Sequence, residues 1–590
     1  MDPKEPRPTS ASARSSDRRR AAGREWPPAA WFALVCALLG LTIGPRLIGP
    51  QLIGPRLAVA DDMPAARPVD PETFVDHDAH PPIPEPAPYE ANLYRYYVRY
   101  GFVQPLADAL DLPGAILDLA GAENEAANVN QFDEVPNSSW FTNRNHFRAV
   151  PVEEIRNGPG NCRRPLPPWI IKSAKASGVN PGFNIEDAAG ERWVIKLDPP
   201  GYPQIGSGAE VVASRLLHAA GYHVPHDVAV VFGHDDLVID PELAAGKEGA
   251  DPFTQEELDR ILDRGGVPPE DGRYFALASL FLPGKPIGHT EMAHRRADDP
   301  NDWYSHRRRR ELRGLAILSA WLNSWDVKDH QSLEMFEARY DTLGSIRHYL
   351  LDFGATLGAA AEGPKRLRTA YEFAFDPGWI GRRWVTLGFI EEPWRSAPQE
   401  TGIPSVGNFA AEEFDPDDFR PTLPHLAFQE LSAADGYWGA KVVASFSDAQ
   451  IAAAVEAAAY EDPRASTYIT GALVKRRDAI ARVWFDRVAP LDFLQVMDGS
   501  LVFNDLEVDL GLAAPRSYEV RAAAVTGTGA GPEPLVISSA GLDLTALAPD
   551  PELDALQLVI SIAGSEALPT VVELRKHGGL WRVVRVRHAA

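Results

Sequence analysis

Acidic, basic and amide side chains stand close together in residues 321–331, in an arrangement that suits phosphoryl transfer. Asp326, Lys328 and Gln331 follow the spacing Asp-x-Lys-x-x-Gln, and further along an apolar, strand-like run ends in Asp352, which a phenylalanine and a glycine follow. In phosphoryl transfer, one acid orients the attacking hydroxyl and a lysine neutralises charge on the transferred group, while an amide oxygen and a second acid bind a metal ion. We assign the first two roles to Asp326 and Lys328, and the metal-binding roles to Gln331 and Asp352.

This layout resembles the catalytic and metal-binding loops of the protein-kinase-like superfamily. The resemblance is carried by the spacing at 326–331 and by Asp-Phe-Gly at 352–354. The atypical bacterial branches, including the HipA-type kinases, and the phosphoinositide kinases are the most similar, and an uncharacterised family of exported bacterial proteins has a similar Trp-Leu-Asn and Asp-Phe-Gly context. The resemblance implies an α+β, two-lobed kinase-like fold, Mg²⁺ or Mn²⁺ as cofactor, and ATP as the phosphoryl donor.

One position departs from the kinase pattern. Kinases carry Asn where this chain has Gln331, whose amide lies one methylene further from the backbone. The longer side chain changes how a metal ion is held. The sequence therefore leaves open both an active kinase and a pseudokinase that keeps the fold as a binding scaffold.

The segment before the motif predicts a sheet that binds nucleotide phosphates. Gly178 and Gly182 stand in its first loop, and Lys196 stands near the end of its third strand. A glycine-bearing loop lets backbone amides approach phosphate, and a lysine on the third strand can pair with it. The strands are expected at 169–174, 183–185 and 192–197.

A helix is predicted next, over 207–220, with Glu210 in its first turn. In a kinase-like fold this helix carries the glutamate that pairs with the strand lysine, so the resemblance implies an ion pair between Lys196 and Glu210. The alternative is that Lys196 is a surface lysine and Glu210 only complements the positive end of the helix dipole.

The elements that complete the two lobes follow in order. Residues 233–272 look like an insertion with one helix, and 283–288 are expected to form the hinge between the lobes. The basic run 306–310 is expected to be the solvated start of a long helix, with an acidic substrate or lipid headgroups as alternative partners. The chain is expected to be irregular from 359 to about 440. Further predicted elements are a strand at 274–282 and helices at 254–262, 312–322, 447–457 and 466–485.

Beyond residue 491 the hydrophobic period becomes two, which predicts strands. Short strands in about a hundred residues suggest a small β-sandwich. No catalytic cluster is found there, so this part is expected to bind a partner or act as a spacer. The clearest strands are 500–503, 518–522, 556–562, 571–574 and 580–586.

Composition limits the partners. With 590 residues, 45% of them hydrophobic, the chain is too long for one core and should form two or three domains. The net charge of −24 argues against a nucleic-acid partner. Two cysteines, Cys36 and Cys162, cannot form a disulfide framework.

The N-terminus carries an export pattern. A basic region precedes the apolar run 29–43, which is short for a bilayer span, and the small residues 58–60 before Asp61 have the form of a cleavage site. We expect a cleaved signal, with an uncleaved inner-membrane anchor as the alternative, and an exported protein that is periplasmic, envelope-associated or secreted.

The expected domains and functions follow from these parts. The main hypothesis is an exported kinase-like protein that transfers the γ-phosphoryl of a nucleotide to an unidentified hydroxyl. Because ATP is scarce outside the bacterial cytoplasm, a pseudokinase scaffold is the second hypothesis, and a structural envelope protein whose β-domain binds a partner is the third. The predicted boundaries are 1–60 for the signal or anchor, 61–90 for a Pro-rich linker, 91–164 for a helical and loop extension, 165–288 for the N-lobe and hinge, 289–488 for the C-lobe, and 489–590 for the β-domain.

Overall fold

The computed structural model describes residues 81–89, 93–110, 124–175, 178–246, 252–265, 272–387, 389, 393–396, 401–412, 414–524, 535–538, 540–547 and 553–588. The predicted signal or anchor at 29–43, the cleavage site before Asp61 and most of the predicted linker lie outside these residues. Among the described residues, no helix combines the length and the hydropathy that a membrane span requires.

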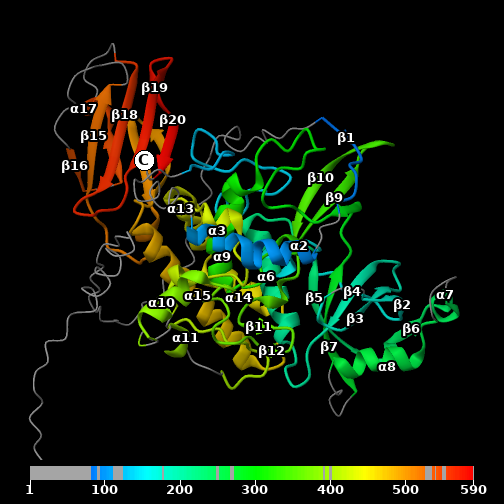
Figure 1. Ribbon diagram of the computed structural model, residues 1–590. Coiled ribbons are helices and arrows are strands. Elements are labelled where there is room, and N and C mark those ends of the chain that lie inside the picture. Colours follow the sequence, from blue (N-terminus) through cyan, green and yellow to red (C-terminus); the bar gives the residue numbers. More distant parts are fainter. Residues whose placement is uncertain are drawn as a thin grey trace, which may run out of the picture. The chain divides into compact units, whose positions relative to one another are not determined.

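A six-stranded sheet forms the predicted nucleotide-binding part (Figure 1). Side chains alternate between the faces of a strand. In the strand that ends at Leu197, Trp193 and Ile195 are therefore buried in the core on one face, and Lys196 points to the other. The strands predicted here are confirmed. In sheet order they are β5 (Asp227–Gly233), β7 (Arg273–Leu280), β4 (Arg192–Leu197), β3 (Gly182–Glu186), β2 (Trp169–Ala174) and β6 (Leu237–Ile239).

Helices cover both faces of this sheet. Leu258 and Leu262 of α8 (Gln255–Arg264), in the predicted insertion, join the core on the face of Trp193. The other face meets α6 (Ile205–Ala220), which begins two residues before the predicted start. Glu210 consequently lies in the second turn of α6, so its predicted place in the first turn is wrong.

A second sheet, in the order β1-β10-β9-β8, lies beyond the predicted hinge. β8 begins within the hinge segment, pairs with β9, and so connects the first sheet to the second. β9 and β10 form an antiparallel hairpin in which Ser332 faces Leu350. The strands are β1 (Ile83–Pro84), β8 (Lys285–Gly288), β9 (Ser332–Ala338) and β10 (Leu343–Leu350).

A bundle of helices forms the larger lobe (Figure 1). The segment from 359 to about 440 was expected to be irregular, but it contains helices. Of the described helices that begin within this segment, α13 is the longest. Two glycines allow its close packing on α9: a Cβ at Gly439 would lie 2.8 Å from Ile317 Cγ1, and one at Gly314 would lie 2.6 Å from Trp438 Cε3. The helices are α9 (Arg310–Leu322), α10 (Pro377–Val385), α11 (Pro393–Ser396), α12 (Leu426–Gln429), α13 (Ala433–Ala444), α14 (Asp448–Glu456) and α15 (Pro463–Phe485).

The basic run before α9 is partly buried, so the prediction of a solvated helix start is wrong for Arg309 and Arg310. Arg309 Nη2 lies 3.1 Å from Asp302 Oδ1, and Arg310 Nε lies 3.0 Å from Asp435 Oδ1. A buried cation must be paired, because leaving it without a partner is costly. Arg313, one turn later, pairs with the same Asp435 at 2.9 Å.

The C-terminal part consists of β-sheets with two single-turn helices, α16 (Leu506–Asp509) and α17 (Leu544–Leu547), between the strands. This confirms the predicted fold class of an α+β protein ending in an all-β domain. Its two sheets, β13-β14-β17 and β16-β15-β18-β19-β20, share one hydrophobic core, as in a sandwich. The strands are β13 (Leu491–Met497), β14 (Ser500–Asp505), β15 (Tyr518–Ala524), β16 (Leu535–Ile537), β17 (Gly541–Asp543), β18 (Ala555–Ile562), β19 (Thr570–His577) and β20 (Leu580–His588).

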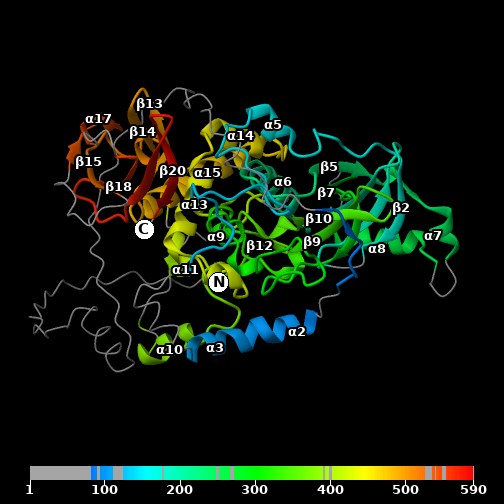
Figure 2. The ribbon, with the colours of Figure 1, turned by 90° about the horizontal axis from the view of Figure 1, so that it is seen from above.

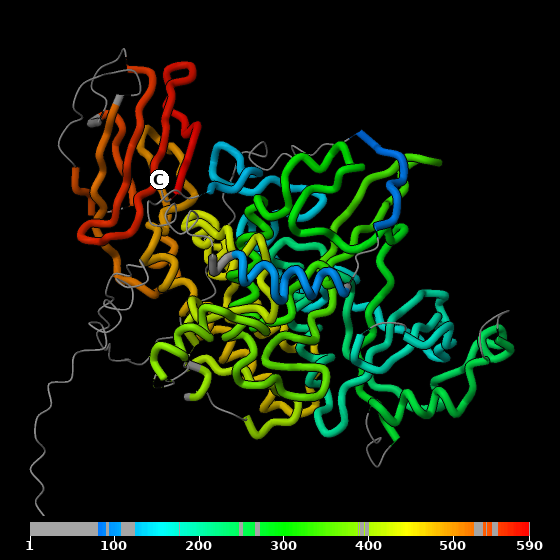
Figure 3. Tube along the Cα trace, viewed as in Figure 1, coloured from blue at the N-terminus to red at the C-terminus, as the bar shows by residue number. Residues whose placement is uncertain are grey.

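A continuous helical stretch precedes both lobes. α2 (Leu93–Val98), a π-helical turn (Arg99–Val103) and α3 (Gln104–Leu110) follow one another without a break, where two short helices were predicted. Figure 3 shows this stretch, in blue, as one run of helical turns. In Figure 2, α3 lies beside α10, and the rings of Phe102 and Phe375 are 5.5 Å apart.

Candidate active site

The β9–β10 hairpin brings the two predicted motifs together. One motif ends where β9 begins, and the other begins where β10 ends. Since the strands are antiparallel, these two ends lie side by side. The N–H of Leu351 donates to the carbonyl of Gln331 at 2.9 Å, so Asp352 enters the site next to Gln331.

The backbone of Asp352 turns sharply as the chain leaves β10. Its φ of 63° and ψ of 59° place it in the left-handed region, which costs a residue with a Cβ on the order of 1–3 kcal/mol and is found most often at functional sites. Phe353, the next residue, is buried, and a Cβ at Gly354, which follows it, would lie 3.4 Å from Glu210 Oε2. The turn therefore connects Asp352 to α6.

Lys196 joins three elements at the site. Its Nζ lies 2.8 Å from Glu210 Oε1 and 2.8 Å from Asp352 Oδ1. Burial lowers the pKa of Lys196, but the charges of Asp352 and Glu210 outweigh it, and the pKa stays above its ordinary value. The Lys196 charge holds the pKa of Asp352 below its ordinary value. The predicted ion pair of Lys196 with Glu210 is present. The alternative, that Lys196 is a surface lysine, is wrong, because its side chain is only 16% exposed.

Asp326 lies within a second polar group. Lys328 Nζ contacts both carboxylate oxygens of Asp326, at 2.9 and 2.8 Å, and Gln331 Nε2 donates to Oδ2 at 2.9 Å. Burial lowers the pKa of Lys328, but Asp326 raises it further. The three side chains are thus held together, and the lysine stays protonated.

The residues present fit a divalent cation bound jointly with phosphate. Asp352 uses Oδ1 for Lys196, which leaves Oδ2 for a ligand. Gln331 binds Asp326 through its nitrogen, which leaves its carbonyl oxygen. Mg²⁺ is commonly held by one or two carboxylates, with the remaining ligands from phosphate and water. Across the part of the chain that the structure describes, no group of three or more His, Cys, Asp or Glu is placed to hold a metal without such help.

The two glycines of the predicted phosphate loop differ in their surroundings. Gly178 has a φ of 86° and lies in the turn, whereas Gly182 is the first residue of β3. A Cβ at Gly182 would lie 1.9 Å from the carbonyl oxygen of Ile195. A glycine is therefore required at 182 for strand packing, and only Gly178 stands where a phosphate-contacting turn is expected.

Sequence reasoning missed two charged residues near Lys196. Lys175, at the start of the glycine loop, donates to the carbonyl of Asn180 at 3.1 Å. Burial and the nearby Lys196 charge lower the pKa of Lys175. Asp227, the first residue of β5, is fully buried, and burial together with the charge of Glu210 raises its pKa to about 8. Lysines are scarce in this chain, so Lys175 carried a usable signal, whereas nothing in the sequence distinguished Asp227.

The N-terminal helical stretch packs on the loop that carries Asp326. The Tyr96 ring lies 5.1 Å from that of His330, and the N–H of Asp329 donates to Tyr96 Oη at 3.3 Å. Lys328 Nζ lies 6.0 Å from the ring centre of Tyr97. His330 also packs against the ring of His289, at 5.0 Å, so it lies among aromatic rings.

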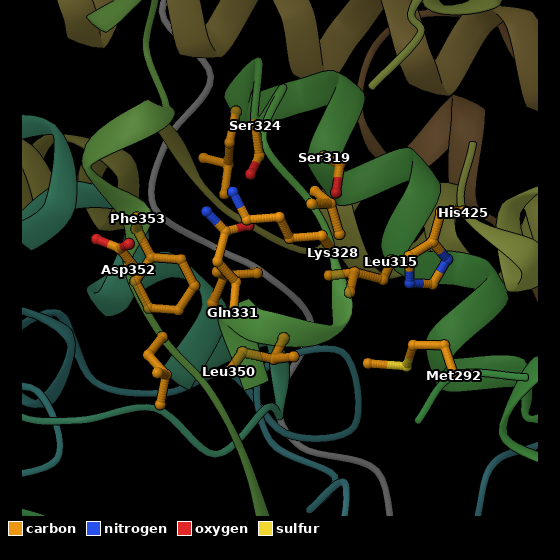
Figure 4. Close-up of a pocket in the computed structure, with 14 residues that line it drawn as sticks. Met292, Leu315, Ser319, Ser324, Lys328, Gln331, Leu350, Asp352, Phe353 and His425 are labelled. Carbon is orange, nitrogen blue, oxygen red and sulfur yellow. The ribbon is translucent and has the colours of Figure 1, made fainter. Parts of the chain in front are cut away.

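A small cavity lies beneath the site. It holds about 30 Å³, room for roughly one water molecule. Figure 4 shows Asp352 and Phe353 on one side of it, Met292 and His425 on the other, and Gln331 between them. The cavity is thus part of the packing under the loop and is too small for a nucleotide.

Comparisons with known proteins found little. No family model matches the chain, and no curated protein matches its sequence. Among solved structures, two crystal structures of the Golgi casein kinase are similar at 13% identity, one of them with Mn and ADP bound. They cover 55% of this chain and 72% and 71% of their own, with TM-scores of 0.25 and 0.26. The kinase-like assignment therefore depends on the order of the elements and the geometry of the site.

Proposed function

We propose that the chain is a kinase-like protein that binds ATP with Mg²⁺ or Mn²⁺ and transfers the γ-phosphoryl to a hydroxyl. The observation that carries the proposal is the position of Lys196, 2.8 Å from both Glu210 and Asp352. Lys196 lies on the third strand of its sheet, Glu210 on the next helix, and Asp352 in the turn after the hairpin, which is the arrangement expected of a kinase.

Each side chain has a role in this scheme. Lys196 holds the nucleotide phosphates, and Glu210 orients Lys196. Asp352 and the Gln331 carbonyl would hold the metal ion, which neutralises phosphate charge. Asp326 orients the acceptor hydroxyl, and Lys328, already 2.8 Å from Asp326, stabilises the transferred group.

Calorimetric titration of ATP into the full-length protein, with and without Mg²⁺ or Mn²⁺, tests this proposal. We expect metal-dependent binding that Asp352→Asn weakens at least tenfold. Asp341→Asn is the matched control, because Asp341 is an exposed aspartate at the opposite end of the β9–β10 hairpin. Equal binding by the wild type and Asp352→Asn would refute the site assignment.

One contact favours a pseudokinase as the second candidate. Gln331 donates its amide N–H to Asp326 at 2.9 Å, and Lys328 contacts both oxygens of the same carboxylate. A carboxylate bound in this way is a weaker partner for an acceptor hydroxyl. Two results together would support this candidate. The wild type would bind ATP without transferring a phosphoryl group, and the Gln331→Asn variant would transfer one.

Export also belongs to the proposal. The basic residues before 29–43 and the small residues 58–60 support a secreted or membrane-anchored protein, in which the β-domain binds an envelope partner. N-terminal sequencing of the protein recovered from its native cells distinguishes the two forms. A mature end near Asp61 supports cleavage, and an intact N-terminus in the membrane fraction supports an anchor.

A further inference from the structure

A second cavity lies in the larger lobe. It holds about 240 Å³, space for a small organic group, and it borders α10, α11 and the segment before Arg420. Figure 1 shows α10 and α11 near each other at the lower edge of the larger lobe. The cavity combines aromatic and charged walls; the side chains that matter here are Tyr371, Trp379, Trp394, Arg382, Asp418 and Arg420.

Backbone hydrogen bonds connect this cavity to the catalytic loop. The N–H of Thr422 donates to the carbonyl of Trp325 at 2.7 Å, directly before Asp326. The N–H of Arg420 in turn donates to the carbonyl of Ala370 at 2.8 Å. With paired backbones about 5 Å apart and residues about 3.8 Å apart along the chain, the Cα of Arg420 lies within about 16 Å of that of Asp326. An acceptor that occupies both places must therefore have more than one unit.

Neighbouring acids hold one aromatic wall and the backbone that carries the other. Trp394 Nε1 donates to Glu372 Oε1 at 2.6 Å, and the backbone N–H of Trp379 donates to Oδ1 of Asp376, the N-cap of α10, at 2.8 Å. The Arg383 guanidinium lies 4.8 Å from the ring centre of Trp379. Fixed aromatic surfaces of this kind lose little conformational freedom when a ligand binds.

We infer that this cavity binds a sugar unit of the acceptor, so that the hydroxyl presented to Asp326 belongs to an oligosaccharide. The inference rests on the proposed function. The C–H face of a sugar ring is apolar and packs on tryptophan, and each hydroxyl both donates and accepts. Asp418 accepts from hydroxyls, while Arg382 and Arg420 donate to them.

A peptide acceptor fits less well. Extended peptides usually add to a sheet edge, and helical peptides need an apolar groove. Short helices and loops form the walls of this cavity, and none of its lining residues belongs to a described strand. The mixture of both charges with aromatic rings suits a polyhydroxylated ligand better.

A glycan array of neutral and uronic-acid-containing oligosaccharides, probed with the full-length protein, tests the inference. We expect binding to at least one class, weakened at least tenfold by Trp379→Ala and by Arg420→Ala and largely kept by Trp379→Phe. Trp303→Ala is the matched control, since Trp303 is 57% exposed and lies outside the cavity. Thermal unfolding of each variant identifies any loss of folding, and Arg420→Ala changes an exposed side chain.

The outcomes separate this inference from the proposed function. Glycan binding that Asp352→Asn keeps and Trp379→Ala loses supports the sugar site. Metal-dependent ATP binding without binding to any glycan overturns the inference and leaves the proposed function intact. Transfer to a peptide library that Trp379→Ala abolishes, with no glycan bound, overturns it in favour of a peptide acceptor.

Discussion

The bridging position of Lys196 predicts that Glu210 and Asp352 contribute non-additively to stability. Each carboxylate lies 2.8 Å from the same ammonium group. Either single substitution leaves Lys196 one charged partner. Glu210→Gln and Asp352→Asn together remove both charged partners from Lys196, whose side chain is 16% exposed.

The exposure of each side chain sets the expected magnitudes. Asp352 is 54% exposed, so Asp352→Asn should cost only about 0.2–1 kcal/mol. Glu210 is 4% exposed, and Glu210→Gln should cost about 1–3 kcal/mol. The double variant resembles a broken buried pair, which costs about 3–5 kcal/mol. It should therefore exceed the sum of the single losses by roughly 1 kcal/mol or more.

Hydrogen exchange of the α6 amides is the assay, because it reports local opening in a chain of several domains. Asp227 could compensate for the loss of Glu210. Without the Glu210 charge, one cause of the raised pKa of Asp227 disappears, and an ionised Asp227 becomes a substitute partner for Lys196. The cycle is therefore repeated with Asp227→Asn. Lys172 provides a matched cycle: it also meets two acids, Asp240 at 2.7 Å and Glu186 at 3.6 Å, but on the surface. The single losses in the opening free energy of the α6 amides could instead add up to the loss of the double variant within about 0.5 kcal/mol, both with Asp227 in place and in the Asp227→Asn background. This result would refute the bridging role of Lys196.

Three further predictions concern the same site. Burial raises the pKa of Asp227 to about 8, so between the ordinary pKa of aspartate and pH 8 the folded protein keeps a proton that the unfolded chain has lost, and the free energy of unfolding falls as the pH rises. Asp227→Asn should remove this contribution to the pH dependence of urea unfolding and raise the free energy of unfolding at pH 7 by on the order of 1–4 kcal/mol. An unchanged pH dependence would contradict the burial argument. Gln331→Asn shortens the side chain and releases Asp326, so metal-dependent ATP turnover should rise at least tenfold, and unchanged turnover would show that Gln331 does not limit the site. Lys175→Met should weaken ATP binding about tenfold through loss of a phosphate partner, and Lys172→Met, on the strand just before Lys175, should leave it unchanged; equal effects would remove Lys175 from the site.

The parts of the site that follow from local periodicity were predictable. Period two placed Lys196 on the face opposite Trp193, and helical spacing identified α6 with Glu210 on it. Antiparallel pairing explains why Asp352 returns to Gln331, since the motifs flank one hairpin. The left-handed backbone of Asp352 could not be read from the sequence, because aspartate tolerates this conformation without requiring it.

The errors arose where tertiary packing overrides local propensity. α13 contains Gly436 and Gly439, which weaken a helix in isolation, yet a Cβ at Gly436 would lie 2.0 Å from the Trp484 ring. The glycines therefore make this helix fit its neighbours. Arg310 resembled a solvated charge because its acidic partners, Asp133 and Asp435, stand far away in the chain. Arg309 has a partner seven residues before it, Asp302, but only the fold buries the two together.

The β-domain is attached to the larger lobe through buried charges, which argues against a passive spacer. Asp133 lies 3.0 Å from His588 Nδ1 at the end of β20 and also pairs with Arg310 at the start of α9. Burial raises the pKa of Asp133, but Arg310 and His588 lower it further, so the carboxylate stays charged between them. Lys441 of α13 likewise contacts Asp492 of β13 at 2.6 Å. Separating the β-domain would leave these charges without partners at a cost of several kcal/mol. Since α9 leads directly into the loop of Asp326, the ion pairs of Asp133 with His588 and Arg310 connect the β-domain to the segment that carries the site.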